Sequence, residues 1–197
     1  MIPSLAYRVL NDIANGSFRS LSQPGEVMSK QRGFSLIELL IVVTIILIIA
    51  AIAIPSLLRA RISANESSAV ASLRTITTAE TTYASSWGTG YAGILDNLGG
   101  PSPCGPATAG AACIIDSLLS LGPNIKSGYK FAARGNTPTG GINNGFEANA
   151  TPNTVDVTGK RAFCADQTGV LRANFTGVPI GTNPGDCSKV LTFVVGN

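Results

Sequence analysis

The longest apolar stretch of the chain runs from Phe34 to Leu58 and contains one charged residue, Glu38. As a helix it would be about 37 Å long at about 1.5 Å per residue, enough to cross the hydrocarbon core of a bilayer. A carboxylate at the centre of such a helix costs about 2.5–3.5 kcal/mol, so an ionisable residue there usually has a function. The milder alternative is that Glu38, near the N-terminal end, reaches the headgroups and interacts favourably with the helix dipole.

Apolar residues continue beyond this stretch with the spacing of an amphipathic helix. They recur three, four or seven residues apart at Leu58, Ile62, Ala69, Leu73, Ile76, Tyr83 and Trp87. Between residues 34 and 87 only Pro55 opposes a helix, and a proline in a long apolar helix more often kinks it than ends it. We therefore expect one helix of about 80 Å, kinked at Pro55 and ended by Gly88 and Gly90.

After Gly88 the sequence changes to glycine, proline, asparagine and threonine with short β-prone runs. A loop region with a short helical turn at residues 114–121 comes first. Five strand candidates follow, at residues 127–134, 145–151, 160–166, 169–175 and 189–195, and residues 166–169 have the chemistry of a hairpin turn. Without crossover helices these runs favour an antiparallel sheet, which would pack on the amphipathic part of the long helix. The expected fold class is α+β.

All four cysteines, Cys104, Cys113, Cys164 and Cys187, follow the apolar stretch. Their even number in loop-rich sequence suggests disulfides formed in an oxidising compartment, with the N-terminus inside the cell and the C-terminus outside the cytoplasm. Of the three possible pairings we expect Cys104 with Cys113, closing a small loop, and Cys164 with Cys187, tying a strand to the C-terminal segment. Buried free thiols are the alternative. Zinc is disfavoured, because the chain has no histidine and no CxxC spacing.

The composition argues against two classes of function. Residues 34–197 hold ten Lys and Arg and nine Asp and Glu, a net charge of +1 that is not typical of nucleic-acid binding. The chain has no histidine to act as a base or metal ligand. Its acidic residues are scattered, and Asp166 is better explained by its turn than by calcium binding. We therefore expect no enzymatic activity, no catalytic residues, no cofactor and no metal.

Two ways of processing the N-terminal segment compete. A secretory signal could be cleaved after residues 51–53, whose small side chains resemble a signal-peptidase site, which would leave Pro55 second in the product. Alternatively, the basic segment ending in KQRG is a leader, and cleavage precedes the apolar stretch. The second interpretation is favoured because the apolar stretch continues into the amphipathic helix, which a removable signal has no reason to do.

Gly33 followed by FSLIEL, residues 34–39, with Pro55 closing the apolar stretch, resembles the N-terminal signature of type IV pilins and of the related pseudopilins of type II secretion. The resemblance extends to about residue 60. It implies that prepilin peptidase, a membrane aspartyl protease, cuts between Gly33 and Phe34 and methylates Phe34. It also implies that Glu38 acts in assembly, and that the helix first anchors the subunit in the inner membrane and then packs into a filament core.

This resemblance divides the chain into three parts. The leader would comprise residues 1–33, of which residues 1–27 would not be translated if Met28 is the true start, as the short leader MSKQRG suggests. Residues 34–58 would form the transmembrane and assembly helix, and residues 59–197 a pilin-like head with cysteine-containing loops.

The expected function is a structural subunit of a bacterial type IV pilus that polymerises with copies of itself. Its other partners would be prepilin peptidase, the pilus or secretion assembly platform and, before assembly, membrane lipid; nucleic acid is not indicated. It would cross the inner membrane once, with its C-terminus periplasmic, and later leave the cell in the filament. The alternatives are a pseudopilin of a type II secretion system, whose heads usually lack two disulfides, and a membrane-tethered extracytoplasmic binding domain.

Overall fold

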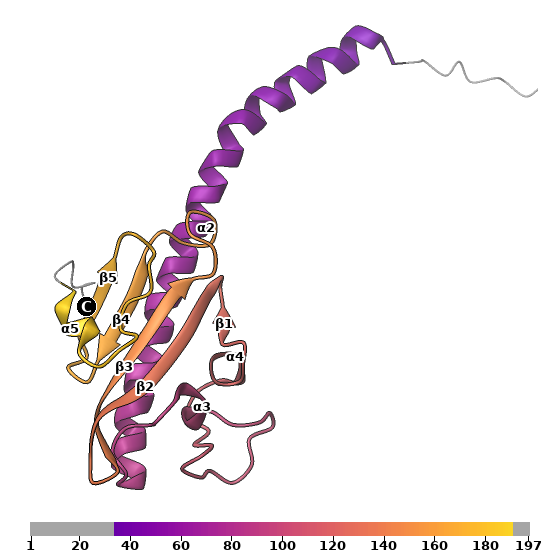
Figure 1. Cartoon of the computed structure of the whole chain (residues 1–197). Coiled ribbons are helices and arrows are strands. Elements are labelled where there is room, and N and C mark those ends of the chain that lie inside the picture. Colours follow the sequence, from indigo (N-terminus) through magenta and orange to yellow (C-terminus); the bar gives the residue numbers. More distant parts are fainter. Residues whose placement is uncertain (1–33, 191–197) are drawn as a thin grey trace, which may run out of the picture. The chain divides into compact units, whose positions relative to one another are not determined.

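The computed structural model describes residues 34–190, which belong to two compact units that meet between Ile45 and Ile46. The described part of the first unit is the N-terminal portion of the long helix. The second unit holds the rest of that helix and the head (Figure 1). The elements are α2 (Leu36–Trp87), α3 (Leu95–Leu98), α4 (Ser117–Ser120), β1 (Ile125–Lys126), β2 (Tyr129–Thr139), β3 (Ile142–Pro152), β4 (Ala162–Asp166), β5 (Leu171–Asn174) and α5 (Asp186–Lys189).

Helix α2 confirms the predicted continuous helix. Its first turn closes with a hydrogen bond of 3.2 Å from the Leu39 amide to the Ser35 carbonyl. Pro55 lies inside it, where its missing N–H leaves one hydrogen bond of the helical ladder unmade. The helix ends at Trp87 because Gly88 adopts a φ of +66°, a left-handed conformation that favours glycine.

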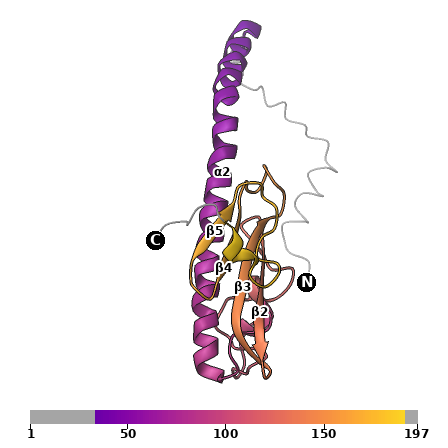
Figure 2. The ribbon, with the colours of Figure 1, turned by 60° about the vertical axis from the view of Figure 1, so that its left-hand side comes forward.

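The five described strands form one antiparallel sheet in the order β1-β2-β3-β4-β5, so every strand pairs with its neighbour in sequence. Its register places apolar side chains opposite one another: Phe131 pairs with Ala150, and Ala150 pairs with Phe163. In two views the sheet runs alongside the C-terminal part of α2 (Figures 1 and 2). The predicted α+β class and antiparallel sheet are therefore confirmed.

The core lies between α2 and one face of the sheet. Leu73 and Ile76 from the helix have no exposed surface, and burial of each such side chain stabilises the fold by about 1.5–3 kcal/mol. Strands β2, β3 and β4 contribute Phe131, Phe146 and Phe163. The expected core face was wrong at one end: Leu58 is 55% exposed, because the buried part of α2 begins only at Glu66 and the sheet covers none of the earlier turns.

Several strand boundaries differ from the predicted ones. β2 and β3 extend into a long hairpin across residues 135–144, which the sequence pattern left as a loop. β4 begins at Ala162 rather than at residue 160, because the two preceding backbone amides bind a carboxylate from α2. The predicted strand at 189–195 is wrong at its start, where Lys189 ends helix α5; residues 191–197 lie outside the described residues.

The outer face of the sheet is covered by the segment that follows β5. The Asn149 side chain of β3 donates a hydrogen bond of 3.0 Å to the Gly181 carbonyl. A disulfide joins Cys164 of β4 to Cys187 of α5, and both cysteines are fully buried. The sheet is therefore covered on both faces, by α2 on one and by residues 176–189 over part of the other.

Candidate functional site

A hydrophobic residue and a carboxylate, four residues apart in sequence, lie uncovered at the N-terminal end of α2. Phe34 is 78% exposed, and Glu38, in the first turn of α2, is also exposed. Within residues 34–190 the Glu38 carboxylate makes no hydrogen bond and no ion pair. Gly33 lies outside the described residues, so cleavage between Gly33 and Phe34 and methylation of Phe34 stay predictions.

The helix that carries Glu38 exposes an unusual amount of apolar surface. Among the described residues, α2 is the one helix long and apolar enough to cross a membrane, and none of its most apolar window is buried. From Leu36 to Leu58 the large aliphatic side chains are between 46% and 81% exposed. The helix passes through residues 51–53 without a break, which disfavours the signal-peptidase interpretation. The kink at Pro55 stays a prediction.

Glu66 joins α2 to the start of β4 through four hydrogen bonds. Its Oε1 accepts from the backbone amides of Lys160 at 2.9 Å and Arg161 at 3.1 Å, and its Oε2 accepts from Arg161 Nε at 2.9 Å and Nη2 at 2.7 Å. The glutamate side chain is 9% exposed and the arginine side chain 36% exposed. Such bidentate pairs between guanidinium and carboxylate fix geometry as well as charge, so Glu66 sets the position of this strand end on the helix.

A second glutamate of α2 is buried without a cation. Glu80 is fully buried; its Oε2 accepts a hydrogen bond of 2.8 Å from the Ala92 amide, and its Oε1 has no partner among the described residues. Burial raises the pKa of Glu80 from 4.5 to about 7, and the hydrogen bond from Ala92 only partly opposes this effect. Glu80 therefore gains or loses its proton near neutral pH. Its hydrogen bond with the Ala92 amide fixes the segment that follows α2 to the helix.

The sequence analysis missed both buried glutamates, although a signal was present. Glu66, Leu73, Glu80 and Trp87 are spaced seven residues apart, which places them on one side of a helix. Leu73 and Trp87 were recognised as facing the sheet. Glu66 and Glu80 share this spacing, so the same argument places them toward the sheet.

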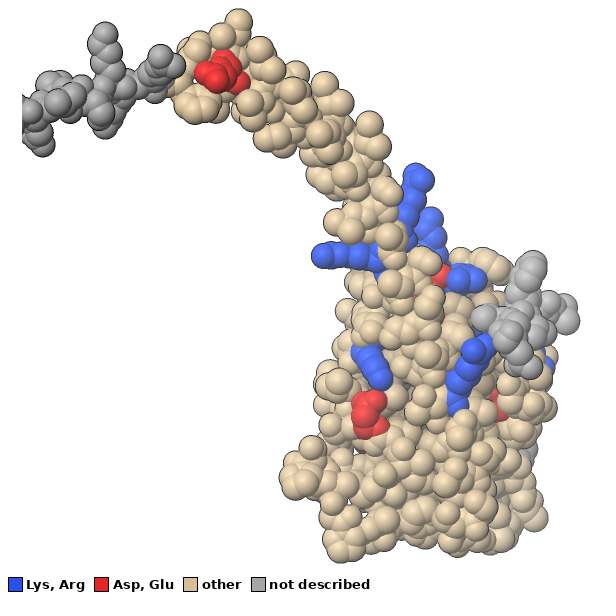
Figure 3. Space-filling view, turned by 180° about the vertical axis from the view of Figure 1, so that it is seen from behind, with Lys and Arg blue, Asp and Glu red and all other residues tan. Residues whose placement is uncertain are grey.

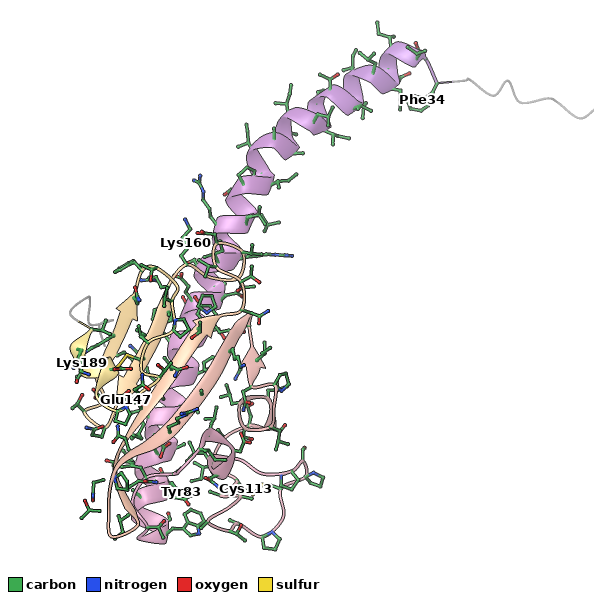
Figure 4. All side chains as sticks on the ribbon, in the orientation of Figure 1. Phe34, Tyr83, Cys113, Glu147, Lys160 and Lys189 are labelled. Carbon is green, nitrogen blue, oxygen red and sulfur yellow. A yellow bond between two sulfur atoms is a disulfide. The ribbon has the colours of Figure 1, made fainter. Side chains whose placement is uncertain are left out.

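Both predicted disulfides are confirmed. Cys104 is bonded to Cys113, with 6.0 Å between their Cα atoms, and Cys164 to Cys187, with 5.8 Å. The first disulfide closes a loop that Tyr83 of α2 binds through a hydrogen bond of 2.7 Å to the Ala109 carbonyl. Figure 4 shows Tyr83 and Cys113 toward the same end of the head. The second disulfide thus fastens the C-terminal segment to β4, whereas the first closes a loop that Tyr83 holds to α2.

The polar residues of the outer sheet face form structural contacts. Asp166 accepts a hydrogen bond of 2.9 Å from the Thr168 amide and another of 2.9 Å from Arg172 Nη1, which confirms the predicted hairpin turn. Across the sheet, Glu147 accepts from the Cys187 amide at 3.4 Å, and burial raises the pKa of Glu147. Within the described part of the chain, no group of three or more acidic or cysteine side chains is arranged to hold a metal ion.

Comparison with known proteins gives one match. Residues 28–54 match the family described as the prokaryotic N-terminal methylation motif. No curated protein and no solved structure matches the chain. The match contains Gly33, Phe34 and Glu38, of which Phe34 and Glu38 lie at the exposed N-terminal end of α2. The chain therefore carries the type IV prepilin signature, joined to an α+β, pilin-like fold.

Proposed function

We propose that this protein is a structural subunit of a bacterial type IV pilus. It is made as an inner-membrane prepilin, cleaved between Gly33 and Phe34, methylated at Phe34 and polymerised through α2. Its partners are prepilin peptidase, the assembly platform and further copies of itself. The head lies in the periplasm before assembly and on the filament afterwards, which agrees with its two disulfides.

One observation carries this proposal: the carboxylate of Glu38 stands without a partner on a helix whose apolar surface is also uncovered. In lipid such a carboxylate is costly, so a retained one needs a use. Cleavage after Gly33 would create an α-amine with an ordinary pKa of about 7.7–8.0, and methylation keeps it basic. In a filament, the terminal amine of one subunit would pair with Glu38 of a neighbour.

This pairing makes Glu38 a device that selects the register of subunits. Apolar surfaces of two helices pack with similar energy in several registers, because the hydrophobic effect is not directional. A buried charge left without its partner costs several kcal/mol, so only the register that joins amine and carboxylate is stable. The aliphatic residues after Glu38 then supply packing area without specificity.

The test replaces Glu38 by alanine or glutamine in a strain that expresses this subunit alone. Intact-mass measurement of the membrane fraction should still find the cleaved chain beginning at Phe34, while electron microscopy of sheared filaments should find none. Ile41→Ala is the matched control: it shortens a side chain that is 51% exposed on the same helix but leaves the charge, and filaments should persist. Normal filaments from Glu38→Ala would refute the pairing.

A pseudopilin of a type II secretion system carries the same signature and is the second candidate. The two disulfides of the head favour the pilus, since pseudopilin heads usually lack two. Immunogold labelling of intact cells separates the two candidates. Labelled fibres outside the cell support the pilus, whereas filaments confined to the periplasm support the pseudopilin.

A further inference from the structure

A hollow of about 340 Å³ lies at the end of the head, beside the turn of α2 that follows its apolar part. Its walls come from three segments that are distant in sequence: α2, the residues before β4 and the residue after β5. They are lined by Arg59, Ile62, Ser63, Glu66, Lys160, Arg161 and Phe175. Figure 4 shows Lys160 close to α2 at this level.

One side of the hollow is rigid and electrically almost neutral. The carboxylate of Glu66 binds the Arg161 guanidinium at 2.7 Å. The same guanidinium lies over two aromatic rings, 5.3 Å from the centroid of Phe163 and 5.9 Å from that of Phe175. Arg161 is therefore held by a carboxylate and two rings, and it forms part of the wall.

The remaining cations of the hollow are available to a ligand. Arg59 makes no hydrogen bond and no ion pair within residues 34–190. Lys160 Nζ lies 3.8 Å from the Asp156 carboxylate, but the two side chains are 64% and 73% exposed, so water screens this pair and it contributes little. Together with Arg161, Glu66 and Asp156, Arg59 and Lys160 bring the charges at the hollow to three positive and two negative.

The first residue that lines the hollow, Arg59, comes directly after the exposed apolar stretch of α2. Ile54, Leu57 and Leu58, the last large apolar residues before Arg59, are between 55% and 57% exposed. Figure 3 shows Lys and Arg side chains gathered around α2 at the edge of the head. In a membrane, the residues that follow an apolar span lie at the depth of the headgroups, where basic side chains bind anionic lipids.

We propose that this hollow binds the headgroup of an anionic phospholipid, with Arg59 and Lys160 contacting the phosphate and Ile62 and Phe175 contacting the glycerol and the first acyl carbons. The proposal rests on the membrane-inserted state of the proposed function. Phe175 is 53% exposed, so part of its ring can contact lipid. The bound lipid would hold the head against the membrane until the subunit enters a filament.

The experiment uses the full chain in detergent with equal amounts of phosphatidylglycerol and phosphatidylcholine of identical acyl chains. Native mass spectrometry gives the ratio of the two lipids retained by the protein. The wild type should favour phosphatidylglycerol, and Arg59→Gln with Lys160→Gln should lower the ratio by about fivefold for each cation removed. Exchange of the cations, Arg59→Lys with Lys160→Arg, keeps both charges and should preserve the ratio.

The matched control removes two positive charges elsewhere in the head, by Lys130→Gln with Lys189→Gln. Lys189 forms an exposed, local ion pair with Asp186 at 3.6 Å, much as Lys160 does with Asp156. This control should keep the lipid ratio of the wild type. An equal loss in both double variants, or no loss in either, would overturn the proposal. The circular dichroism spectrum of each variant, compared with that of the wild type, checks that the variant is folded.

Two further outcomes separate this proposal from others. If Arg59→Gln with Lys160→Gln abolishes filaments but leaves the lipid ratio unchanged, the occupant is an acidic group of a neighbouring subunit and the lipid proposal is wrong. The lipid measurement needs no filament, so it does not depend on Glu38. If Glu38→Ala still builds filaments while the lipid ratio follows the two cations, the pairing role of Glu38 fails and the lipid site stands.

Discussion

Replacing Glu80 with glutamine should remove a large part of the pH dependence of the head's stability. In the folded chain the pKa of Glu80 is about 7, against 4.5 for an ordinary glutamate, because the carboxylate is fully buried. In the unfolded chain the side chain is in water and ionises near its ordinary value. Between these two pKa values the folded state therefore binds more protons than the unfolded state.

The sign and size of the effect follow from this difference. Below about pH 4.5 Glu80 is protonated in both states and does not affect the free energy of unfolding. As the pH rises from about 4.5 to 7, the group ionises in the unfolded chain but keeps its proton in the folded one, so the wild type loses stability over this interval. At about 1.4 kcal/mol per unit of pKa, a difference of 7 − 4.5 corresponds to a loss of about 3 kcal/mol above pH 7.

The assay is urea unfolding of the full chain in a non-ionic detergent at several pH values between 4.5 and 8, followed by fluorescence. Trp87 is the only tryptophan of the chain, and it packs on the core with its ring 5.1 Å from that of Tyr83. The informative quantity is the difference between wild type and Glu80→Gln, because Glu147 also has a raised pKa and adds a loss of the same sign to both proteins.

The glutamine variant has a constant cost, since its amide lacks a partner at the position of the unbound Oε1. That cost lowers the free energy of unfolding of the variant by the same amount at every pH. The stability of the variant relative to the wild type should therefore increase as the pH rises. Asp156→Asn serves as the control, because Asp156 is exposed and should not change the slope. A difference between wild type and Glu80→Gln that stays flat from pH 4.5 to 8 would refute the assignment of a buried, protonated Glu80.

Two further predictions concern the ends of the chain. Intact-mass measurement of filament or membrane protein should give a subunit that begins at methylated Phe34, and a product that begins at Ile54 would contradict the prepilin interpretation. Replacing Cys164 and Cys187 together by serine should lower the free energy of unfolding by about 3 kcal/mol, because the disulfide closes a separation of 23 residues. Urea unfolding curves that are the same for this variant and for the wild type would contradict a stabilising role.

Elements with one buried face were predictable from the sequence. In α2 and in strands β2, β3 and β5, apolar residues recur with the period of a helix or a strand, because one face meets the core, whereas β4 is a short run buried on both faces. The disulfides were predictable as well, since each pair closes the shorter of the available loops. These features depend on the local pattern of side chains alone.

The distal half of the β2–β3 hairpin was not predicted, because it is held by backbone pairing rather than by buried side chains. Residues 135–144 are mostly polar, and Pro138 reads as a strand breaker. Proline is tolerated there because the carbonyl of Asn143, the residue paired with Pro138, accepts a hydrogen bond of 3.0 Å from the Tyr91 amide, so the missing proline donor leaves no acceptor unsatisfied. The Gly140–Gly141 dipeptide, with φ values of +59° and +83°, was the available signal for a tight hairpin turn.

The candidate site divides in the same way. Phe34 and Glu38 follow from a short motif at a fixed spacing and could be named from the sequence. The hollow beside Arg59 could not, because Lys160 and Phe175 reach it only through the fold of the sheet. The partner proposed for Glu38 belongs to another subunit, so neither the sequence nor the fold of one chain contains it.

The tip of the β2–β3 hairpin also makes the head suitable for labelling. A side-chain carbon added at Gly140 or Gly141 would meet no atom within 4 Å, and both residues are exposed. Lengthening a flexible loop costs only about 0.6 kcal/mol for each doubling of its length. A short epitope inserted between these glycines would therefore leave the core, both disulfides and α2 intact, and would report where the subunit is displayed on a living cell.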